Sequence, residues 1–202
     1  EIGTEEAIRR YTHRELKRFL DIVFSKLGKK SKKIKFGVIQ SGTSLMGTKN
    51  TGSFNQDRLY RMIKVCNDFD ILSKEHNGDY LSLDEIRVRF DTGLSAINIA
   101  PEMGRDETKI ILDEIRNLGR EDLYDKFFKI CYKSKKWVKW FDKDFSPKSS
   151  KEALLLASGH YVFSSESFQE IKKEISRLDE VAQSHHVKKL ENLISATTRG
   201  AL

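Results

Sequence analysis

The chain has 202 residues, of which 38% are hydrophobic and 33% charged, and its formal net charge is +7. This length fits one domain with room for a helical appendage. No apolar run approaches the roughly 20 residues that a membrane helix requires, and the first residues lack the basic-then-apolar pattern of a signal peptide. Cys66 and Cys131 lie far apart in helical patterns, so we expect two buried, reduced thiols in a cytoplasmic protein.

Much of the positive charge lies in two clusters, at residues 29–35 and 133–140. Tryptophans separate the lysines of the second cluster, and aromatic rings between cations can stack on the bases of a single-stranded nucleic acid. The net charge is modest, however, and no nucleic-acid-binding motif is present. We therefore favour solvated faces, disfavour nucleic acid as a partner and expect no membrane partner.

The first expected helix begins at Thr12, which has capping-box spacing to Glu15. Apolar residues recur at helical spacing as far as Leu27, and Gly28 suits a helix C-cap. A basic stretch follows, and the apolar run 36–40 then predicts a buried strand.

Residues 46–53 are rich in Gly, Thr, Lys and Asn, which fits either an active-site lid or a plain surface loop. Asn55 suits the N-cap of a second helix, whose apolar stripe ends at Cys66. The apolar run 69–72 then predicts a second strand.

The chain turns polar directly after this run, and Ser82 with Glu85 has the spacing of another capping box. We therefore predict that a strand ends, a polar loop follows and a helix begins at Ser82. The polar residues of this loop include Glu75, His76, Asn77, Gly78 and Asp79.

A third strand is expected over 94–100 and a further helix through residue 115. The alternation of strands and helices predicts an α/β fold with parallel strands joined by right-handed crossovers. The strands are apolar throughout, which is typical of a sheet covered on both faces. From Arg120 onward only helices are expected, so we predict an α/β domain over 1–119 and a helical extension over 120–202.

Three strands, with residues 1–3 as the stub of a fourth, are too few to close a (β/α)₈ barrel, which needs eight strands and about 250 residues. A half-barrel standing alone exposes parallel edges, which is a liability. Two architectures therefore remain open. One is an open doubly wound sheet, and the other is the C-terminal half of a barrel.

His76 follows a predicted strand end, where ligands bind in α/β folds. Imidazole suits a divalent metal or proton transfer near neutral pH, and Glu75 or Asp79 can orient it. A lone histidine is a weak metal signal, and a structural role for it stays open.

Polar groups at the neighbouring strand ends predict contacts with a substrate. Backbone N–H groups at Asn77 and Gly78, before a helix, suit an anion. Asn98 ends a strand with an amide that needs partners. Gln40 and Ser41 stand at the corresponding carboxyl end of the first strand.

The loop 75–80, followed by residues 98–101, resembles the class II (metal-dependent) ketose-bisphosphate aldolase superfamily. Within it, the Z-type subunit of tagatose-bisphosphate aldolase is the most similar. In the resemblance, residues 1–5 match the end of the fifth barrel strand and 37–42 the sixth strand. The His76 loop matches the seventh strand and 97–99 the eighth. The resemblance thus implies the C-terminal half of a (β/α)₈ TIM barrel followed by a helical region.

The resemblance also implies a divalent metal such as zinc, with His76 and Glu1 as ligands, acting as a Lewis acid in the aldol cleavage of a phosphorylated ketose. His76, Asp79 and Glu75 are then the catalytic candidates. Asn77, Gly78, Asn98, Gln40 and Ser41 are the substrate-binding candidates. The histidine that the family carries after the sixth strand is absent here, where Gln40 and Ser41 stand. The alternative that we keep is a subunit without chemistry, which binds a catalytic aldolase subunit or forms a homo-oligomer.

Overall fold

The computed structural model describes residues 1–3, 10–46 and 49–198. Thr4 and Glu5, which belong to the first matched strand end, lie outside the described residues, as does the end of the chain from residue 199. Residue contacts divide the chain into two compact units. The first comprises residues 1–45, 50–99 and 192–202, and the second comprises 46–49 and 100–191.

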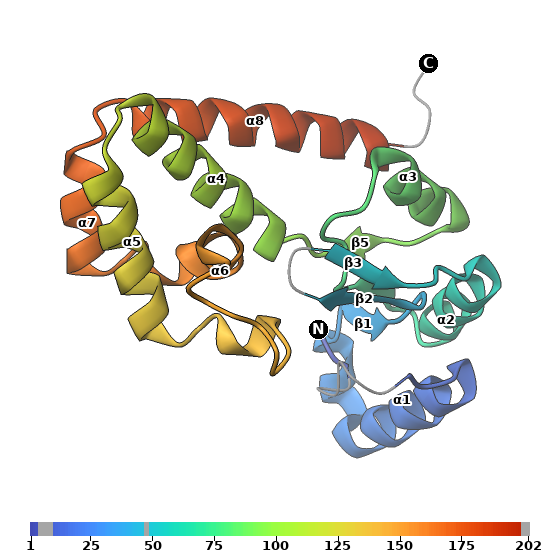
Figure 1. The fold of residues 1–202 in the computed structure, drawn as a ribbon. Coiled ribbons are helices and arrows are strands. Elements are labelled where there is room, and N and C mark those ends of the chain that lie inside the picture. The colour runs from blue at the N-terminus through green and yellow to red at the C-terminus, as the bar shows by residue number, and fades with distance from the viewer. Residues whose placement is uncertain (4–9, 47–48, 199–202) are drawn as a thin grey trace. The chain divides into compact units, whose positions relative to one another are not determined.

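The first unit is built on a parallel sheet of three strands, in the order β1 (Phe36–Ile39), β4 (Leu72–Glu75) and β5 (Ala96–Ile97) (Figure 1). Ile2 adds a parallel bridge to Gly37 at the outer side of β1. The predicted α/β class and the parallel strand direction are therefore confirmed.

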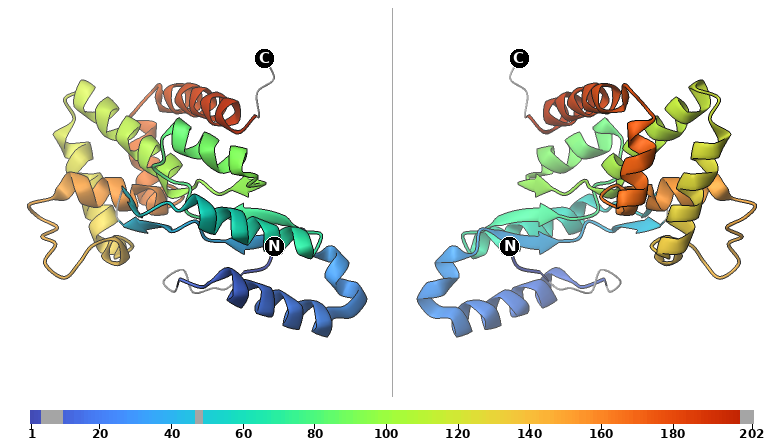
Figure 2. Two further views of the ribbon diagram at one scale, coloured as in Figure 1. Left: turned by 90° about the vertical axis from the view of Figure 1, so that its right-hand side faces the viewer. Right: turned by 90° about the vertical axis from the view of Figure 1, so that its left-hand side faces the viewer.

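Helix α2 (Gln56–Asp68) packs on β1 and β4, and α1 (His13–Leu27) and α3 (Leu83–Thr92) pack against α2. Figure 2 shows α2 lying along the sheet. The approach is close, because a Cβ atom added to Gly37 would lie 2.9 Å from the Sγ atom of Cys66. The core formed here contains Tyr11, Leu16, Leu20, Ile39, Leu59, Met62, Ile63, Val65, Cys66, Ile71 and Leu94.

The other face of this sheet is only partly covered. Val38 pairs with Lys74 and Phe36 with Leu72, and these side chains alternate with the ones that face α2. Leu72 is 51% exposed. We call this surface, formed by Phe36, Val38, Leu72 and Lys74, the open face. The expectation that both faces are covered is not met among the described residues.

Three helix starts follow the sequence prediction. Thr12 with Glu15 and Ser82 with Glu85 form capping boxes at α1 and α3, and Asn55 caps α2. In each box the hydroxyl accepts from the third helical N–H and the glutamate accepts from the cap N–H, so two otherwise unpaired donors are satisfied.

Replacing Ser82 with alanine is expected to lower the free energy of unfolding by about 1 kcal/mol, because the Glu85 N–H loses its acceptor. Ser150→Ala is the matched control, since Ser150 precedes helix α6 (Lys151–Ser158) without a side-chain cap bond. Urea unfolding measures both variants. Equal losses for the two would show that the Ser82 cap contributes nothing.

Two segments of the chain differ from the prediction. Strand β4 begins where the apolar run ends, and its polar side chains find partners: the Ser73 hydroxyl lies 3.4 Å from that of Ser95, and Glu75 accepts from Arg89. The loop expected over 46–53 contains strand residues instead, since β2 (Thr43–Met46) pairs with β3 (Lys49–Gly52). Residues 47–48 of that loop lie outside the described part of the chain.

The second unit is helical, with no strand in residues 100–191, as predicted from Arg120 onward. Its elements include α4 (Pro101–Asn117), α5 (Glu121–Ser134), η2 (Val138–Trp140), α6, η3 (Gly159–Val162), α7 (Glu166–Lys173) and the greater part of α8 (Leu178–Thr197) (Figure 1). Phe127 and Phe168 meet in its core with ring centroids 5.1 Å apart. Helix α4 packs against α5, α6 and η3, so residues 100–119 belong with the helical unit by their contacts. The domain boundary predicted at residue 119 stays a prediction.

Each unit contains one buried cysteine without a disulfide, Cys66 in the first and Cys131 in the second. Burial raises the pKa of both thiols to about 12, so both stay protonated at neutral pH. The prediction of two buried thiols is confirmed. None of the described helices combines the length and apolarity needed to cross a membrane.

Candidate functional site at the carboxyl edge of the sheet

The strand register brings the predicted site segments to one edge. Glu75 pairs with Ile39 on one side and with Ile97 on the other, so Gln40, His76 and Asn98 each follow a strand at the same level. The Asn98 N–H donates to the Glu75 carbonyl at 2.8 Å, which extends the pairing by one step. The edge has two sides, because successive residues of β4 point to opposite faces.

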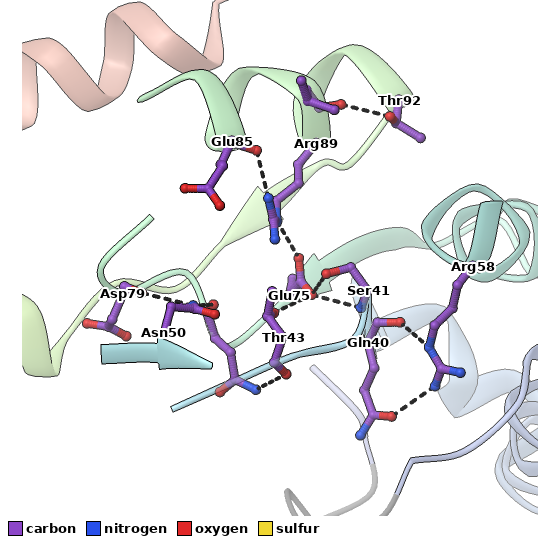
Figure 3. A network of polar contacts seen from close by, with 12 residues as sticks. Gln40, Ser41, Thr43, Asn50, Arg58, Glu75, Asp79, Glu85, Arg89 and Thr92 are labelled. Carbon is purple, nitrogen blue, oxygen red and sulfur yellow. Dashed lines mark hydrogen bonds and ion pairs between the residues drawn. The ribbon is translucent and has the colours of Figure 1, made fainter. Parts of the chain in front are cut away.

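On the helix side, the carboxylate of Glu75 is buried, with 2% of the residue exposed (Figure 3). Its Oε1 atom accepts from the Ser41 N–H at 2.8 Å, from the Ser41 hydroxyl and from Thr43 Oγ1 at 3.3 Å. Its Oε2 atom accepts from Nε of Arg89 at 3.1 Å. These hydrogen bonds join Glu75 to Ser41 within the fold. The catalytic role predicted for Glu75 and the substrate contact predicted for Ser41 stay predictions.

Arg89 is fully buried and completes this network from α3. Its Nη1 donates to the Glu85 carbonyl at 2.8 Å, and its guanidinium lies 4.3 Å from the ring centroid of Phe54. Its Nη2 is buried without a hydrogen-bond partner among the described residues. Sequence reasoning missed Arg89, which is fully buried. The available signal was the three-residue spacing from Ile86 to Arg89.

The polar loop after β4 is held by its own protein contacts. Asn50 Nδ2 donates to the carbonyls of Asn77 at 3.0 Å and Asp79 at 2.9 Å (Figure 3). The Gly78 N–H donates to the Asn98 carbonyl at 3.1 Å, and a Cβ at Gly78 would lie 2.5 Å from Ile97 Cγ1. Asp79 is buried, with 1% exposed. The N–H group of Gly78, predicted to face an anion, is thus engaged within the protein.

Gln40 joins the sheet edge to two helices. Its Oε1 accepts from the Tyr11 N–H at 3.3 Å and from Arg58 Nη2 at 3.2 Å, and its carbonyl accepts from Arg58 Nε at 2.9 Å (Figure 3). Its predicted substrate contact stays a prediction, as does that of the half-buried Asn98.

On the open-face side, three charged or ionisable side chains meet. Nζ of Lys74 lies 2.6 Å from Oε2 of Glu1, and Nε2 of His76 lies 2.9 Å from Oε1 of the same carboxylate. The side chains of Lys74, Glu1 and His76 are 21%, 35% and 44% exposed. The hydrogen bond from Lys74 is the largest influence on the pKa of Glu1, and together with the bond from His76 it holds this pKa below its usual value. Desolvation acts in the opposite direction but is outweighed, so Glu1 is ionised at neutral pH. We call these residues the Lys74–Glu1–His76 cluster.

The predicted metal site was tested against these contacts. Its two predicted ligands, His76 and Glu1, do lie together, but the third group beside them is the ammonium of Lys74, which cannot bind a cation. A catalytic zinc usually takes three protein ligands. The described residues contain no group of three or more His, Cys, Asp or Glu side chains placed to hold a metal. The residues present therefore do not fit the expected metal.

No family model and no curated protein matches this sequence. Solved structures do match its fold. A crystal structure of a probable tagatose 6 phosphate kinase from Sinorhizobium meliloti 1021 aligns with a TM-score of 0.70 and 13% identity, covering 88% of this chain and 49% of that one. A glycerol-complexed fructuronate-tagaturonate epimerase from Cohnella laeviribosi aligns with a TM-score of 0.66 and 12% identity, covering 97% of this chain and 44% of that one. The chain thus spans about half the length of these proteins and shares their fold.

Proposed function

We propose that this chain handles a phosphorylated ketose at the carboxyl edge of its sheet, on the open-face side. The observation that carries the proposal is the Lys74–Glu1–His76 cluster, in which an ammonium and an imidazole lie partly exposed at the end of β4. A cation suits a phosphate or sugar oxyanion, and an imidazole moves protons near neutral pH. The names of both matched structures refer to ketose derivatives, fructuronate and tagaturonate in one and tagatose 6 phosphate in the other, and the second of these supports a phosphorylated ketose.

We further propose that the chain is the second half of a (β/α)₈ barrel. Its strands are parallel, helix α2 covers one face, and the open face carries the partly exposed Leu72. In a closed barrel, inward side chains from alternate strands fill the interior. The open face has the composition of such an interior, and the matched structures are about twice as long as the part that aligns.

The chemistry that we propose is aldolase-like, either in an enzyme or in a subunit that supports a catalytic aldolase. In the enzyme form, His76 transfers a proton to or from a sugar oxygen, with Glu1 as its supporting carboxylate. One observation favours the supporting form: Glu75 and Asp79, the two carboxylates expected to assist His76, are buried at 2% and 1% exposure.

Tagatose 6-phosphate is expected to bind the full chain, and unphosphorylated tagatose to bind more weakly. His76→Ala should weaken the binding of tagatose 6-phosphate by about tenfold, which corresponds to one hydrogen bond to a charged group. Isothermal titration calorimetry measures both. His185→Ala is the matched control, because His185 belongs to the second unit, is similarly exposed at 47% and also lies beside a carboxylate, that of Asp106.

Equal affinity for tagatose with and without its phosphate, or no binding of either, would contradict the proposal. Release of a triose phosphate from tagatose 1,6-bisphosphate then separates the two forms. Cleavage that His76→Ala abolishes identifies the enzyme. Stable association with a catalytic aldolase, whose activity is unchanged by His76→Ala, identifies the supporting subunit.

A further inference from the structure

Lys74 is held in place by contacts from three segments of the first unit. Its Nζ atom binds Oε2 of Glu1 at 2.6 Å and lies 5.5 Å from the ring centroid of Phe36, a residue of β1. Its backbone is fixed on both sides, because it pairs with Val38 in β1 and with Ala96 in β5. The ammonium therefore has a defined position at the open face and is not a freely moving surface charge.

The same contacts occupy the groups that a metal would need. Both oxygens of Glu1 already accept, one from Lys74 and the other from His76. A carboxylate oxygen accepts hydrogen bonds but does not donate, so Nε2 of His76 is the donor in this contact and would have to lose that hydrogen to bind a metal beside Glu1. A divalent ion bound to Glu1 would also lie within a few ångströms of the Lys74 ammonium, where like charges repel strongly.

We propose that the ammonium of Lys74 is the resident cation of this site and that it binds an oxyanion of the substrate without a divalent metal. This inference rests on the proposed function for the identity of the ligand, a phosphorylated ketose. Lys74 donates to Glu1 through one N–H, and an ammonium has two further donors for a phosphate or enediolate oxygen. Glu1 is then the positioning residue, because its carboxylate contacts and orients both the ammonium and the imidazole.

The test combines metal content with ligand binding on the full chain. Purified protein is expected to contain far less than one equivalent of zinc, and EDTA should leave its affinity for tagatose 6-phosphate within about twofold. Lys74→Met should weaken that affinity by about tenfold or more, while Lys74→Arg should retain most of it. Lys17→Met is the matched control, since Lys17 also pairs with a carboxylate, that of Asp21, and lies 5.3 Å from the ring centroid of Phe69.

Loss of binding on EDTA treatment, with recovery on added zinc, would overturn the inference and leave the proposed function standing. Unchanged binding in Lys74→Met would overturn it as well. If no phosphorylated ketose binds the wild-type chain, the proposed function fails and the assigned ligand fails with it. Whether Lys74 or a divalent metal is the cation of the site is then decided by titrating zinc alone and following the imidazole signals by NMR. A stoichiometric shift of the His76 signal, absent in His76→Ala, would refute the assignment of Lys74, and no shift would support it.

Discussion

Arg89→Ala is expected to lower the free energy of unfolding by about 3–5 kcal/mol, the cost of leaving one partner of a buried ion pair without its counter-charge. The Glu75 carboxylate is 2% exposed, so the charge that remains is poorly hydrated. The variant also removes the contact with Phe54. Urea unfolding measures the loss, and labelling of Cys66 reports opening of the first unit, because this thiol is buried in its core.

Arg87→Ala on the same helix is the control for Arg89→Ala. Arg87 is about half exposed and pairs with the exposed Asp84, so its loss should cost no more than about 1 kcal/mol. The double variant Glu75→Gln with Arg89→Met should be more stable than Arg89→Ala, since no uncompensated charge remains buried. Similar losses for Arg87→Ala and Arg89→Ala would mean that the buried pair contributes no more than a surface pair.

Phe127→Ala is expected to lower the free energy of unfolding by about 3–5 kcal/mol through the cavity that it opens in the second unit. The ring is fully buried and packs against Phe168. A Cβ atom added to Gly159 would lie 3.0 Å from the Cζ atom of Phe127, so the backbone of Gly159 also approaches the ring closely. Labelling of Cys131, which belongs to the same core, follows the opening.

Phe128→Ala tests whether burial determines the size of that effect. Phe128 is the next residue of α5 and is only partly buried, with its ring 5.8 Å from that of Tyr132. It should lose clearly less stability than Phe127→Ala. A larger loss of stability for Phe128→Ala than for Phe127→Ala would contradict the prediction, because it would mean that the face of α5 carrying Phe128 is the one buried in the core.

Local signals in the sequence were sufficient for much of the fold. The capping boxes at Thr12 and Ser82 form as predicted because both partners lie within one helical turn. The parallel direction of the strands also follows from the alternation of strands with helices. These features depend on neighbours in sequence or on a general rule of chain connection, so no knowledge of distant contacts is required.

The buried polar network was not predictable in the same way. Glu75 reads as a loop residue, because a charged side chain is rarely buried without a partner. Its partners are supplied 34 residues earlier by Ser41 and 14 residues later by Arg89. The pairing of β2 with β3 was missed for a related reason, since Gly- and Thr-rich sequence carries little apolar alternation. Lys74 was overlooked because only the strand register brings it beside Glu1.

The open face also defines what a complementary polypeptide must offer. Bulky side chains are required opposite Phe36, Val38 and Leu72, where hydrocarbon is incompletely screened from water. Above the ammonium of Lys74 the same polypeptide must leave a hydrated space. Under the proposed half-barrel architecture, these two demands would suit the chain to a split-protein design, in which binding of the proposed ligand, a sugar phosphate, reports that two separately expressed pieces have associated.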